Sequence, residues 1–419
     1  MSGGVSGGRT RRGPVRLTIV DDNSFIRDAD GRVRPKAATF HRFAEAVVRA
    51  GPFGVARYVI PVRDARNGTG PDPRALGPVD ESLLRIVPSA PFEGAAGYLM
   101  ALPGMLRYNL PLLRRAVSGE HLVWIKLPAS NGAAAALVAD ALGVARFSYV
   151  VGNVREVVGA SPRSGPARVA ALGAAALHDG IIGALTRTGP TVRLGAELFT
   201  SSFTAADLDQ AGEGLVDPPA SGGESSARGV TRLVWAGRMA PEKDLRTLLR
   251  AVTLLRAAGW PAQVTLIGDG PERSRLEAQA RTLGISDAVT WLGYVGDRER
   301  YLAALRASDL FVLPSLSEGV PKVLVEAMAC GLPVIASSAG AIPELLGGGR
   351  RGRLFRPGNE IDLAAAIRAT AEDPAGLRRF RAAGVAWAAD HTAERQAERL
   401  VAWMRTAFPN LPWPAEAPS

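Results

Sequence analysis

The sequence is poor in cysteine, in histidine and in long apolar runs. Cys330 is the only cysteine among 419 residues, which excludes an intrachain disulfide. No uninterrupted apolar run approaches the roughly 18 residues that a membrane-spanning helix requires. Residues 1–13 are rich in Gly, Ser and Arg and lack the apolar segment of a signal peptide. We therefore expect a disordered tail followed by a soluble, cytoplasmic protein without a transmembrane helix.

Metal ligation and nucleic-acid binding also lack their usual signatures. The histidines show no metal-ligand spacing, and no Asp-x-Asp motif stands at a strand end, so we expect no metal. The net charge is +10, but no basic stripe alternates with aromatic residues, which argues against nucleic acid as a partner. Cys330 falls within an expected helix with no activating cation in view, so it is interpreted as a core residue.

A Pro-, Gly- and Ser-rich stretch divides the chain into two patterned halves. This stretch, 214–229, is typical of a linker. After it, short apolar strands alternate with helical patterns, which predicts a parallel, doubly wound α/β sheet with its ligand site at the carboxyl ends of the strands. The strands are expected at 232–236, 262–267, 288–292, 310–313 and 334–336, and the helices at 245–258, 272–283, 298–307 and after 321.

The first half alternates less regularly, and a second Rossmann-like domain is the economical interpretation. Strands are expected at 15–20, 54–62, 122–127 and 145–151, with helices at 38–50, 132–142 and 168–185. Further amphipathic helices are expected at 374–387 and 393–408. The predicted domains are a tail at 1–13, an N-terminal Rossmann-like domain at 14–213, a linker at 214–229, a C-terminal Rossmann-like domain at 230–392, and a last helix and tail at 393–419.

The most informative segment runs from Ser315 to Ala336 and combines a strand, a tight turn, a helix and a strand. Pro321 suits the first position of the helix, because its missing N–H would have no partner there. The amides of Gly319 and Val320 would then point out of a helix N-terminus, which carries partial positive charge and suits a phosphate.

Two glutamates flank this turn. Glu318 precedes it, and Glu326 follows eight residues later inside the helix. A fully helical path between them would span roughly 12 Å, too far for the paired acids of a glycosidase, which lie about 5 to 10 Å apart. A nucleotide sugar fits better, because one carboxylate can accept hydrogen bonds from a ribose diol and the other from sugar hydroxyls.

Two cations follow an earlier strand of the same half. Arg238 and Lys243 stand where the strand ending at Gly237 passes into a helix. Cations at the carboxyl end of a parallel strand can clamp a diphosphate and neutralise a leaving group. The alternative is an ordinary solvated turn, with a salt bridge to Glu242 or Asp244.

The signature resembles that of the retaining GT-B glycosyltransferases of family four, the glycosyl transferases group 1. Their donor site carries Glu, seven residues, Glu, followed by Ala-Met-Ala-x-Gly-x-Pro-Val. The resemblance covers 230–400 by motif and 15–213 by architecture. It implies two Rossmann-like domains that face an interdomain cleft, with a C-terminal helix that crosses back to the first domain. It further implies metal-independent transfer of a hexosyl or N-acetylhexosaminyl group from a nucleoside diphosphate sugar, expected to be a UDP-sugar, with the anomeric configuration retained.

The resemblance also implies roles for individual residues. Arg238 and Lys243 would stabilise the leaving diphosphate, Glu318 would hold the donor sugar, and Glu326 would hold the ribose. Tyr294 is a candidate neighbour of the base, whereas the turn at 268–270 is expected to be scaffold. The backbone positions expected to bind the donor are Gly237, Gly293, Gly319, Val320 and Pro321.

The first half departs from the family pattern. The paired-glycine loop has no counterpart near Arg34 and Pro35, and Lys126 stands where the family has a histidine. We therefore expect an unusual, small and soluble hydroxylated acceptor, with Lys126 either close to the transfer site or merely on the rim of the cleft. His41 could line the same cleft, or could lie on a helix surface.

Three other functions stay open at this point. A GT-B nucleotide-sugar epimerase would share the fold, and a noncatalytic nucleotide-sugar-binding protein would fit the altered first half. A membrane-surface enzyme that glycosylates a lipid is suggested by the apolar and basic stretch 98–115, although core packing explains that stretch more simply. The nucleotide base, the donor sugar, the acceptor and the oligomeric state are not determined by the sequence.

Overall fold

The protein is described from a computed structural model. It describes residues 14–90, 107–151, 173–212 and 229–414, except for 24, 29, 36–39, 65–77, 130, 174–175, 177–178, 181, 196 and 202. The predicted tail at 1–13 and nearly all of the predicted linker at 214–229 lie outside the described residues, as does much of the helix expected at 168–185.

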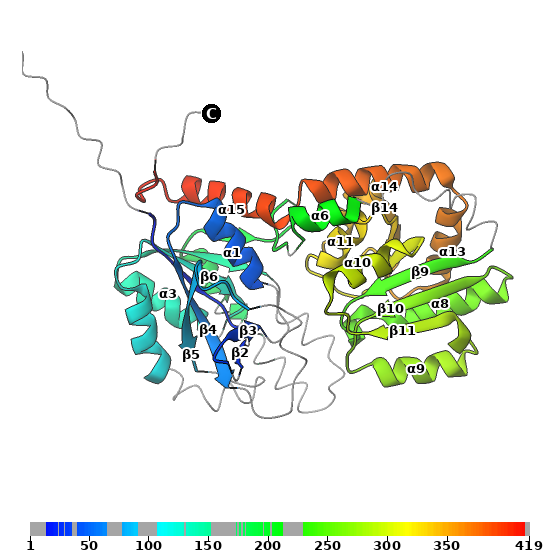
Figure 1. Ribbon diagram of the computed structural model, residues 1–419, viewed down its shortest axis with the longest axis horizontal. Helices are drawn as coiled ribbons and strands as arrows, with labels where there is room; N and C mark the ends of the chain where they lie inside the picture. Colours follow the sequence, from blue (N-terminus) through cyan, green and yellow to red (C-terminus); the bar gives the residue numbers. More distant parts are fainter. Residues whose placement is uncertain are drawn as a thin grey trace, which may run out of the picture. The chain divides into compact units, whose positions relative to one another are not determined.

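Two compact units make up the chain, each built around its own sheet (Figure 1). The first unit comprises residues 1–150, 181–192 and 397–419, and the second comprises 151–180 and 193–396. The C-terminal helix α15 (Ala393–Ala407) therefore leaves the second unit and joins the first, as expected of the crossing helix. Within the first unit, Trp403 of α15 packs against Phe147, with ring centroids 5.2 Å apart.

The sheet of the first unit has eight strands in the order β3-β2-β4-β1-β6-β7-β8, with β5 also paired to β4. Pairing among β1, β2, β4, β5, β6 and β7 is parallel, whereas β2 and β3 run antiparallel. The strands are β1 (Leu17–Val20), β2 (Phe25–Arg27), β3 (Val33–Pro35), β4 (Ala56–Asp64), β5 (Leu84–Ser89), β6 (Leu122–Leu127), β7 (Ala145–Val150) and β8 (Thr191–Arg193).

The predicted strands of this unit are confirmed to within about two residues at each end, but β2, β3, β5 and β8 were not predicted. Each of these four is short or is mostly partly exposed, so none carries a continuous apolar run. The helices are α1 (Phe40–Ala50), a helical segment at 107–117 and α3 (Gly132–Ala141). Trp124, on the central strand β6, is fully buried among aromatic rings of α1 and β7.

The second unit contains a fully parallel sheet of six strands in the order β11-β10-β9-β12-β13-β14. Its inner strands are apolar on both faces, as expected for a sheet covered by helices on both sides. The strands are β9 (Thr231–Ala236), β10 (Ala262–Ile267), β11 (Val289–Gly293), β12 (Leu310–Leu313), β13 (Val334–Ser337) and β14 (Gly352–Phe355). The doubly wound α/β prediction is confirmed.

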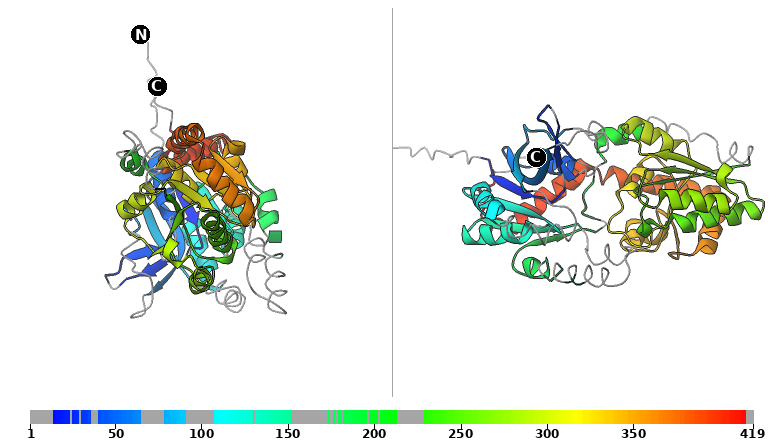
Figure 2. Two further views of the ribbon diagram at one scale, coloured as in Figure 1. Left: turned by 90° about the vertical axis from the view of Figure 1, so that its right-hand side faces the viewer. Right: turned by 90° about the horizontal axis from the view of Figure 1, so that it is seen from below.

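Helices cover both faces of this second sheet (Figures 1 and 2). On one face α8 packs against α9 and α13, and on the other α11 packs against α14. The helices are α6 (Ala205–Gly212), α8 (Leu245–Ala257), α9 (Arg273–Thr282), α10 (Arg298–Arg306), α11 (Lys322–Ala329), α12 (Ile342–Leu345), α13 (Glu360–Ala371) and α14 (Pro374–Ala389).

The division between the units differs from the predicted boundary at 213. Residues 193–213 belong to the second unit, although the sequence analysis placed them in the first domain. The reason is packing: Phe199 and Phe203 are buried in the core of the second unit, and Phe199 stacks on Trp387 of α14 with ring centroids 5.9 Å apart. A local sequence pattern does not reveal a contact partner almost 190 residues away.

Candidate donor site

The order in which strands are added to the second sheet reverses between β9 and β12. From β9 the chain adds β10 and β11 on one side, and it then returns to place β12, β13 and β14 on the other. In open α/β sheets a ligand crevice is expected at such a point, at the carboxyl ends of the two neighbouring strands. Arg238 and Lys243 follow β9, and Glu318 follows β12.

A charged contact joins these two loops. Lys243 Nζ lies 2.7 Å from Glu318 Oε1, and the Glu318 side chain is 8% exposed. Ser315 Oγ donates to the same carboxylate oxygen at 2.7 Å. A backbone bond from Leu316 N to Glu242 O, at 2.8 Å, ties the loops together a second time. The alternative in which Lys243 pairs with Glu242 or Asp244 is thus wrong.

Arg238 stands apart from this pair. Its side chain is exposed, and among the described residues it has no ion-pair or hydrogen-bond partner. Gly237, just before it, donates its backbone N–H to Ile267 O at the end of β10. The loop thus has one cation held by a carboxylate and another that faces solvent.

Glycines let the neighbouring backbones approach this crevice closely. A Cβ on Gly268 would lie 1.9 Å from Gly237 O, so the turn after β10 acts as a scaffold for the β9 loop, as predicted. A Cβ on Gly340 would lie 1.8 Å from Glu318 O, and Gly340 has a φ of +54°. The loop after β13 thus supports the backbone of Glu318.

The turn before α11 differs in detail from the prediction. Pro321 has an extended backbone (φ −74°, ψ 105°) and occupies the N-cap, and the helix begins at Lys322 rather than at Pro321. The missing N–H still fits, because an N-cap residue makes no helical N–H bond. Gly319 is exposed and Val320 is partly exposed, so this helix end faces outward.

Gly293 and Tyr294 lie farther along the sheet. Gly293 ends β11, two strands from β9, and its carbonyl accepts a 2.7 Å hydrogen bond from Gly268 N. This contact links Gly293 to the scaffold turn. Tyr294 is 57% exposed, and its contact with a base stays a prediction.

Glu326 belongs to a second polar cluster, formed with α10. Its Oε1 accepts from Arg298 Nη1 at 2.9 Å, and its Oε2 accepts from Tyr301 Oη at 2.7 Å. Arg298 also donates to Asp207 of α6 at 2.8 Å. Burial and the adjacent Glu326 charge raise the pKa of the Tyr301 hydroxyl well above its usual value, so it stays a donor. Each Glu326 oxygen retains a lone-pair site, because a carboxylate accepts about four hydrogen bonds.

The first unit holds its own buried ion pair at the carboxyl ends of its strands. Lys126 lies on β6, and Asp21 directly follows β1. Lys126 Nζ is 2.6 Å from Asp21 Oδ1, and Asp21 is fully buried. Tyr58 of β4 donates to Asp21 Oδ2 at 2.6 Å, and Asn23 donates to it at 2.9 Å. The Lys126 ammonium also lies 4.6 Å from the ring centre of Phe40. Lys126 is thus part of a buried ion pair, and its position close to the transfer site stays a prediction.

Two further interpretations can be compared with the structure. His41 lies on α1 and is 2% exposed, so its placement on a helix surface is wrong; its ring packs edge-on against Phe25 instead. Cys330 is buried at the C-cap of α11, and burial raises the pKa of its thiol to about 12. Its interpretation as an unreactive core residue is confirmed.

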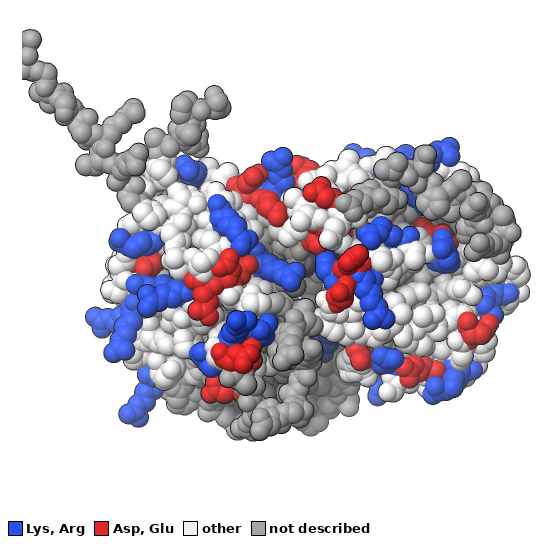
Figure 3. Space-filling model, viewed as in Figure 1, with Lys and Arg blue, Asp and Glu red and all other residues white. Residues whose placement is uncertain are grey.

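The described residues contain no candidate metal cluster. No three His, Cys, Asp or Glu side chains are grouped so as to hold a metal ion in this part of the chain. Basic and acidic side chains are interspersed on the face in Figure 3. None of the described helices combines the length and the apolarity needed to cross a membrane.

Several residues of these clusters escaped the sequence analysis. Arg298 and Tyr301 contact Glu326, and Asp207 contacts Arg298, but no spacing relates these three to the signature. Ser315, which contacts Glu318, opens the signature segment but was not nominated. Asp21 could have been noticed, because it directly follows an apolar strand at the edge where ligands bind. Its partner Lys126 is 105 residues away, so only the pairing of β1 with β6 brings the two together.

Sequence comparison with known proteins shows which family the second half of the chain resembles. The family model for glycosyl transferases group 1 matches residues 230–373. The chain is 32% identical over 166 residues to 2-deoxystreptamine glucosyltransferase of Streptomyces kanamyceticus, which covers 40% of this chain and 43% of that protein. It is 32% identical over 246 residues to D-inositol 3-phosphate glycosyltransferase of Rhodococcus erythropolis, covering 57% of this chain and 52% of that protein. The matches thus span about half the length of these relatives.

Solved structures resemble the chain over nearly its whole length. Sucrose-phosphate synthase of Thermosynechococcus elongatus aligns with a TM-score of 0.63 at 19% identity, covering 94% of this chain and 99% of that one. HepE of Anabaena, solved in complex with UDP-glucose, aligns with a TM-score of 0.57 at 16% identity, covering 93% and 99%. Identities this low establish the fold alone, which is that of the GT-B glycosyltransferases. Within the second unit, residues 230–373 are similar to the glycosyl transferases group 1 family.

Proposed function

We propose that the protein transfers a hexosyl or N-acetylhexosaminyl group from a nucleoside diphosphate sugar to an acceptor hydroxyl. The observation that carries this proposal is the Lys243–Glu318 contact across the point where the second sheet changes direction, with Arg238 exposed beside it. That crevice is where open α/β sheets bind nucleotides. UDP is the proposed nucleotide, because HepE, a structural neighbour, was solved with UDP-glucose.

The residues of the donor site would bind different parts of the nucleotide sugar. The diphosphate would lie against Arg238, Lys243 and the amides of Gly319 and Val320, which would stabilise the charge that grows on the leaving phosphate. Glu318 would share Lys243 with the diphosphate and accept hydrogen bonds from the sugar. Glu326 would use its remaining lone pairs for the ribose hydroxyls.

We propose that transfer retains the anomeric configuration and needs no divalent metal. The acceptor hydroxyl would attack from the face that the diphosphate leaves, and the departing phosphate oxygen would take the acceptor proton. No protein nucleophile is then required. The cations of the β9 loop would supply the positive charge that a metal ion supplies in other transferases.

The acceptor is proposed to be a small hydroxylated molecule, bound in the first unit near the carboxyl ends of β1 and β6. Two relatives are named for such molecules, 2-deoxystreptamine and D-inositol 3-phosphate. Asp21 and Lys126 place a fixed charge pair at this edge of the sheet. Lys126 has two N–H groups beyond its bond to Asp21, and these could donate to an acceptor oxygen.

Arginine and lysine variants of the β9 loop test the donor site. Arg238→Ala and Lys243→Ala should each lower turnover of a UDP-sugar by about 100-fold or more, the cost of removing one charged transition-state donor. Arg250→Ala serves as the matched control, because Arg250 lies on α8 with its side chain 55% exposed and faces Glu360 rather than the site. Normal turnover in both Arg238→Ala and Lys243→Ala would contradict the assignment of these residues to the donor site.

The chemistry is tested separately. UDP release that depends on an added acceptor indicates transfer, whereas an interconverted sugar without acceptor indicates an epimerase, and binding without turnover indicates a noncatalytic protein. Proton NMR of the product should show the anomeric configuration of the donor, and activity should persist in EDTA. An inverted product rejects retention, and loss of activity that Mg²⁺ restores rejects metal independence.

A further inference from the structure

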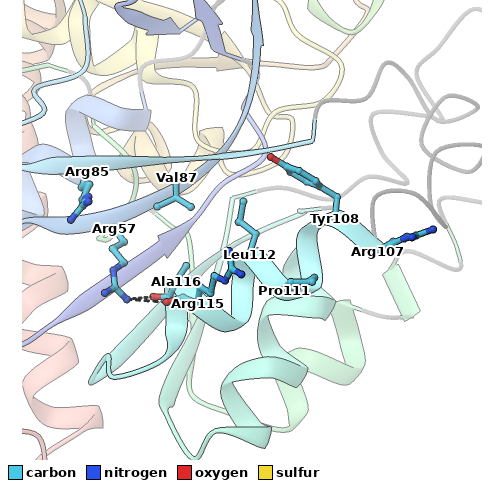
Figure 4. Close-up of a pocket in the computed structure, with 9 residues that line it drawn as sticks. All are labelled: Arg57, Arg85, Val87, Arg107, Tyr108, Pro111, Leu112, Arg115 and Ala116. Atoms are coloured by element: carbon cyan, nitrogen blue, oxygen red, sulfur yellow. Dashed lines mark hydrogen bonds between the residues drawn. The ribbon is translucent and has the colours of Figure 1, made fainter.

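The described residues of the first unit contain a pocket that the proposed transfer does not use. Its volume is about 590 Å³, and it is lined by Arg57, Arg85, Val87, Arg107, Tyr108, Pro111, Leu112, Arg115 and Ala116 (Figure 4). We refer to it as the arginine pocket. It lies between the start of strands β4 and β5 and the helical segment 107–117.

The arginine pocket lies at the opposite edge of the sheet from Asp21 and Lys126. Arg57 and Arg85 are the second residues of β4 and β5, whereas Asp21 follows the end of β1 and Lys126 is the penultimate residue of β6. Because these strands are parallel, their starts and their ends form two separate edges. The pocket is therefore distinct from the proposed acceptor side.

One arginine of the pocket is already neutralised. Arg57 Nη1 lies 2.9 Å from Glu120 Oε1, and it donates to Ala116 O at 2.6 Å near the end of the helical segment. Figure 4 shows the bond from Arg57 to Ala116 as a dashed line. Arg57 thus closes a helix C-terminus, where a cation is favoured, and serves as part of the framework.

The remaining arginines are not neutralised. Arg85 is the direct cross-strand neighbour of Arg57, so like charges stand side by side on one face of the sheet. Arg85, Arg107 and Arg115 are exposed, and their guanidinium groups have no ion-pair or hydrogen-bond partner among the described residues; the backbone carbonyl of Arg115 accepts from Arg57 Nη1 at 3.3 Å. None of the described residues that line the pocket is acidic. Arg107 points away from Arg57 and Arg85 in Figure 4, so Arg85 and Arg115 carry the argument.

The walls of the pocket are apolar. Val87, Pro111 and Leu112 line it, and Tyr108 stands beside them with 56% of its surface exposed. A volume of this size is typical of small-molecule sites, which occupy about 300 to 1,000 Å³. The combination of free guanidinium groups with apolar walls suits a ligand that has an anionic head and a less polar body.

We propose that the arginine pocket binds a phosphate ester, with the phosphate held by Arg85 and Arg115 and the body of the ligand against Val87 and Leu112. The guanidinium fork matches two phosphate oxygens at once, which favours phosphate over a weakly charged group. The phosphate can belong to a soluble metabolite or to the headgroup of an anionic lipid.

Binding of two probes tests this proposal on the full chain. The first probe is glycerol 3-phosphate, titrated calorimetrically in buffer that contains saturating UDP, so that the donor site is occupied. The second is cosedimentation with phosphatidylcholine vesicles that contain or lack phosphatidylglycerol. Arg85→Gln and Arg115→Gln are compared with Arg114→Gln, a matched control whose side chain is exposed on the same helical segment but does not line the pocket.

The expected result is a loss of about tenfold or more in affinity for Arg85→Gln and Arg115→Gln, the effect of removing one charge-assisted hydrogen bond. Arg114→Gln should bind like the parent protein. If glycerol 3-phosphate shows this pattern, the ligand is soluble; if only vesicles with phosphatidylglycerol show it, the ligand is a lipid headgroup. Equal loss in all three variants, or no binding of either probe by the parent protein, overturns the proposal. These outcomes do not depend on whether the protein transfers a sugar.

Discussion

Replacing Lys126 with methionine would leave a buried carboxylate without its cation. Asp21 is fully buried, and among the described residues its only positively charged partner is Lys126, at 2.6 Å. Removing one member of a buried ion pair typically costs about 3 to 5 kcal/mol, because the remaining charge stays desolvated. Tyr58 and Asn23 continue to donate to Asp21, which places the expected cost near the lower end of that range.

The reverse substitution should cost less. In Asp21→Asn the unpaired group is Lys126, whose side chain is 11% exposed and flexible, so its ammonium can move toward water. The double variant Asp21→Asn, Lys126→Met removes both charges and should be more stable than Lys126→Met alone. Arg49→Met provides a matched control, because its pair with Asp80 is exposed at 58% and 37%, and such surface pairs contribute about 0 to 1 kcal/mol.

Differential scanning calorimetry would measure these effects, since it can separate the transitions of the two units. For a unit of this size a loss of 1 kcal/mol lowers the melting temperature by about 2 to 4 °C, so a loss near 3 kcal/mol in Lys126→Met should lower it by about 6 to 12 °C. A double variant whose loss equals the sum of the two single losses would refute the coupling. A loss in Lys126→Met no larger than in Arg49→Met would refute the buried pair itself.

The double variant Asp21→Asn, Lys126→Met also tests the proposal that the acceptor binds beside Lys126. Because its fold is expected to be preserved, acceptor-dependent transfer and acceptor-independent hydrolysis of the donor can be compared without a stability defect. Loss of transfer with retained hydrolysis supports acceptor binding beside Lys126. Unchanged transfer would restrict Lys126 to a structural role.

Three further predictions follow from the second unit. Glu326→Gln should mainly weaken UDP binding, because the ribose contact precedes the reaction, whereas Glu318→Gln should mainly lower turnover; equal changes in KM and kcat for both variants would contradict the separate roles. Gly340→Ala should weaken UDP binding in a titration while the fold persists, since its Cβ would lie 1.8 Å from Glu318 O and displace that loop; unchanged affinity would show that the loop yields without effect. Cys330, whose pKa burial raises to about 12, should resist iodoacetamide at pH 8 in the native state and react in urea, because almost no thiolate exists so far below that pKa; rapid native alkylation would contradict its burial.

The pattern of the second half was sufficient to predict most of its fold. Strands β10 and β12 begin and end at the predicted residues, because each is a short apolar run bounded by turn residues or by a charged residue. The positions of Arg238, Lys243 and Glu318 at strand ends could be predicted as well, since a parallel sheet brings the carboxyl ends of its strands to one edge. The eight-residue spacing of Glu318 and Glu326 can also be read directly from the sequence.

Contacts between distant segments could not be predicted in this way. The sequence left open whether Lys243 pairs with Glu242, Asp244 or another group, and only the pairing of β9 with β12 brings it to Glu318. The cluster around Glu326 draws Asp207 from a segment that the sequence assigned to the other domain. Lys126 could be interpreted as a surface residue, because local sequence carries no information about the carboxylate of Asp21 that lies beside it.

The amino-acid sequence by itself determined the alternation of strands and helices in the second unit, its donor-site signature and the strand ends at which charged residues stand, because these features depend on neighbours within a few positions. The tertiary structure decided which charges meet, which side chains are buried and where Arg57 and Arg85 gather into a pocket. Those outcomes depend on strand order and register, which bring together residues far apart in the chain and set the local dielectric around each charge.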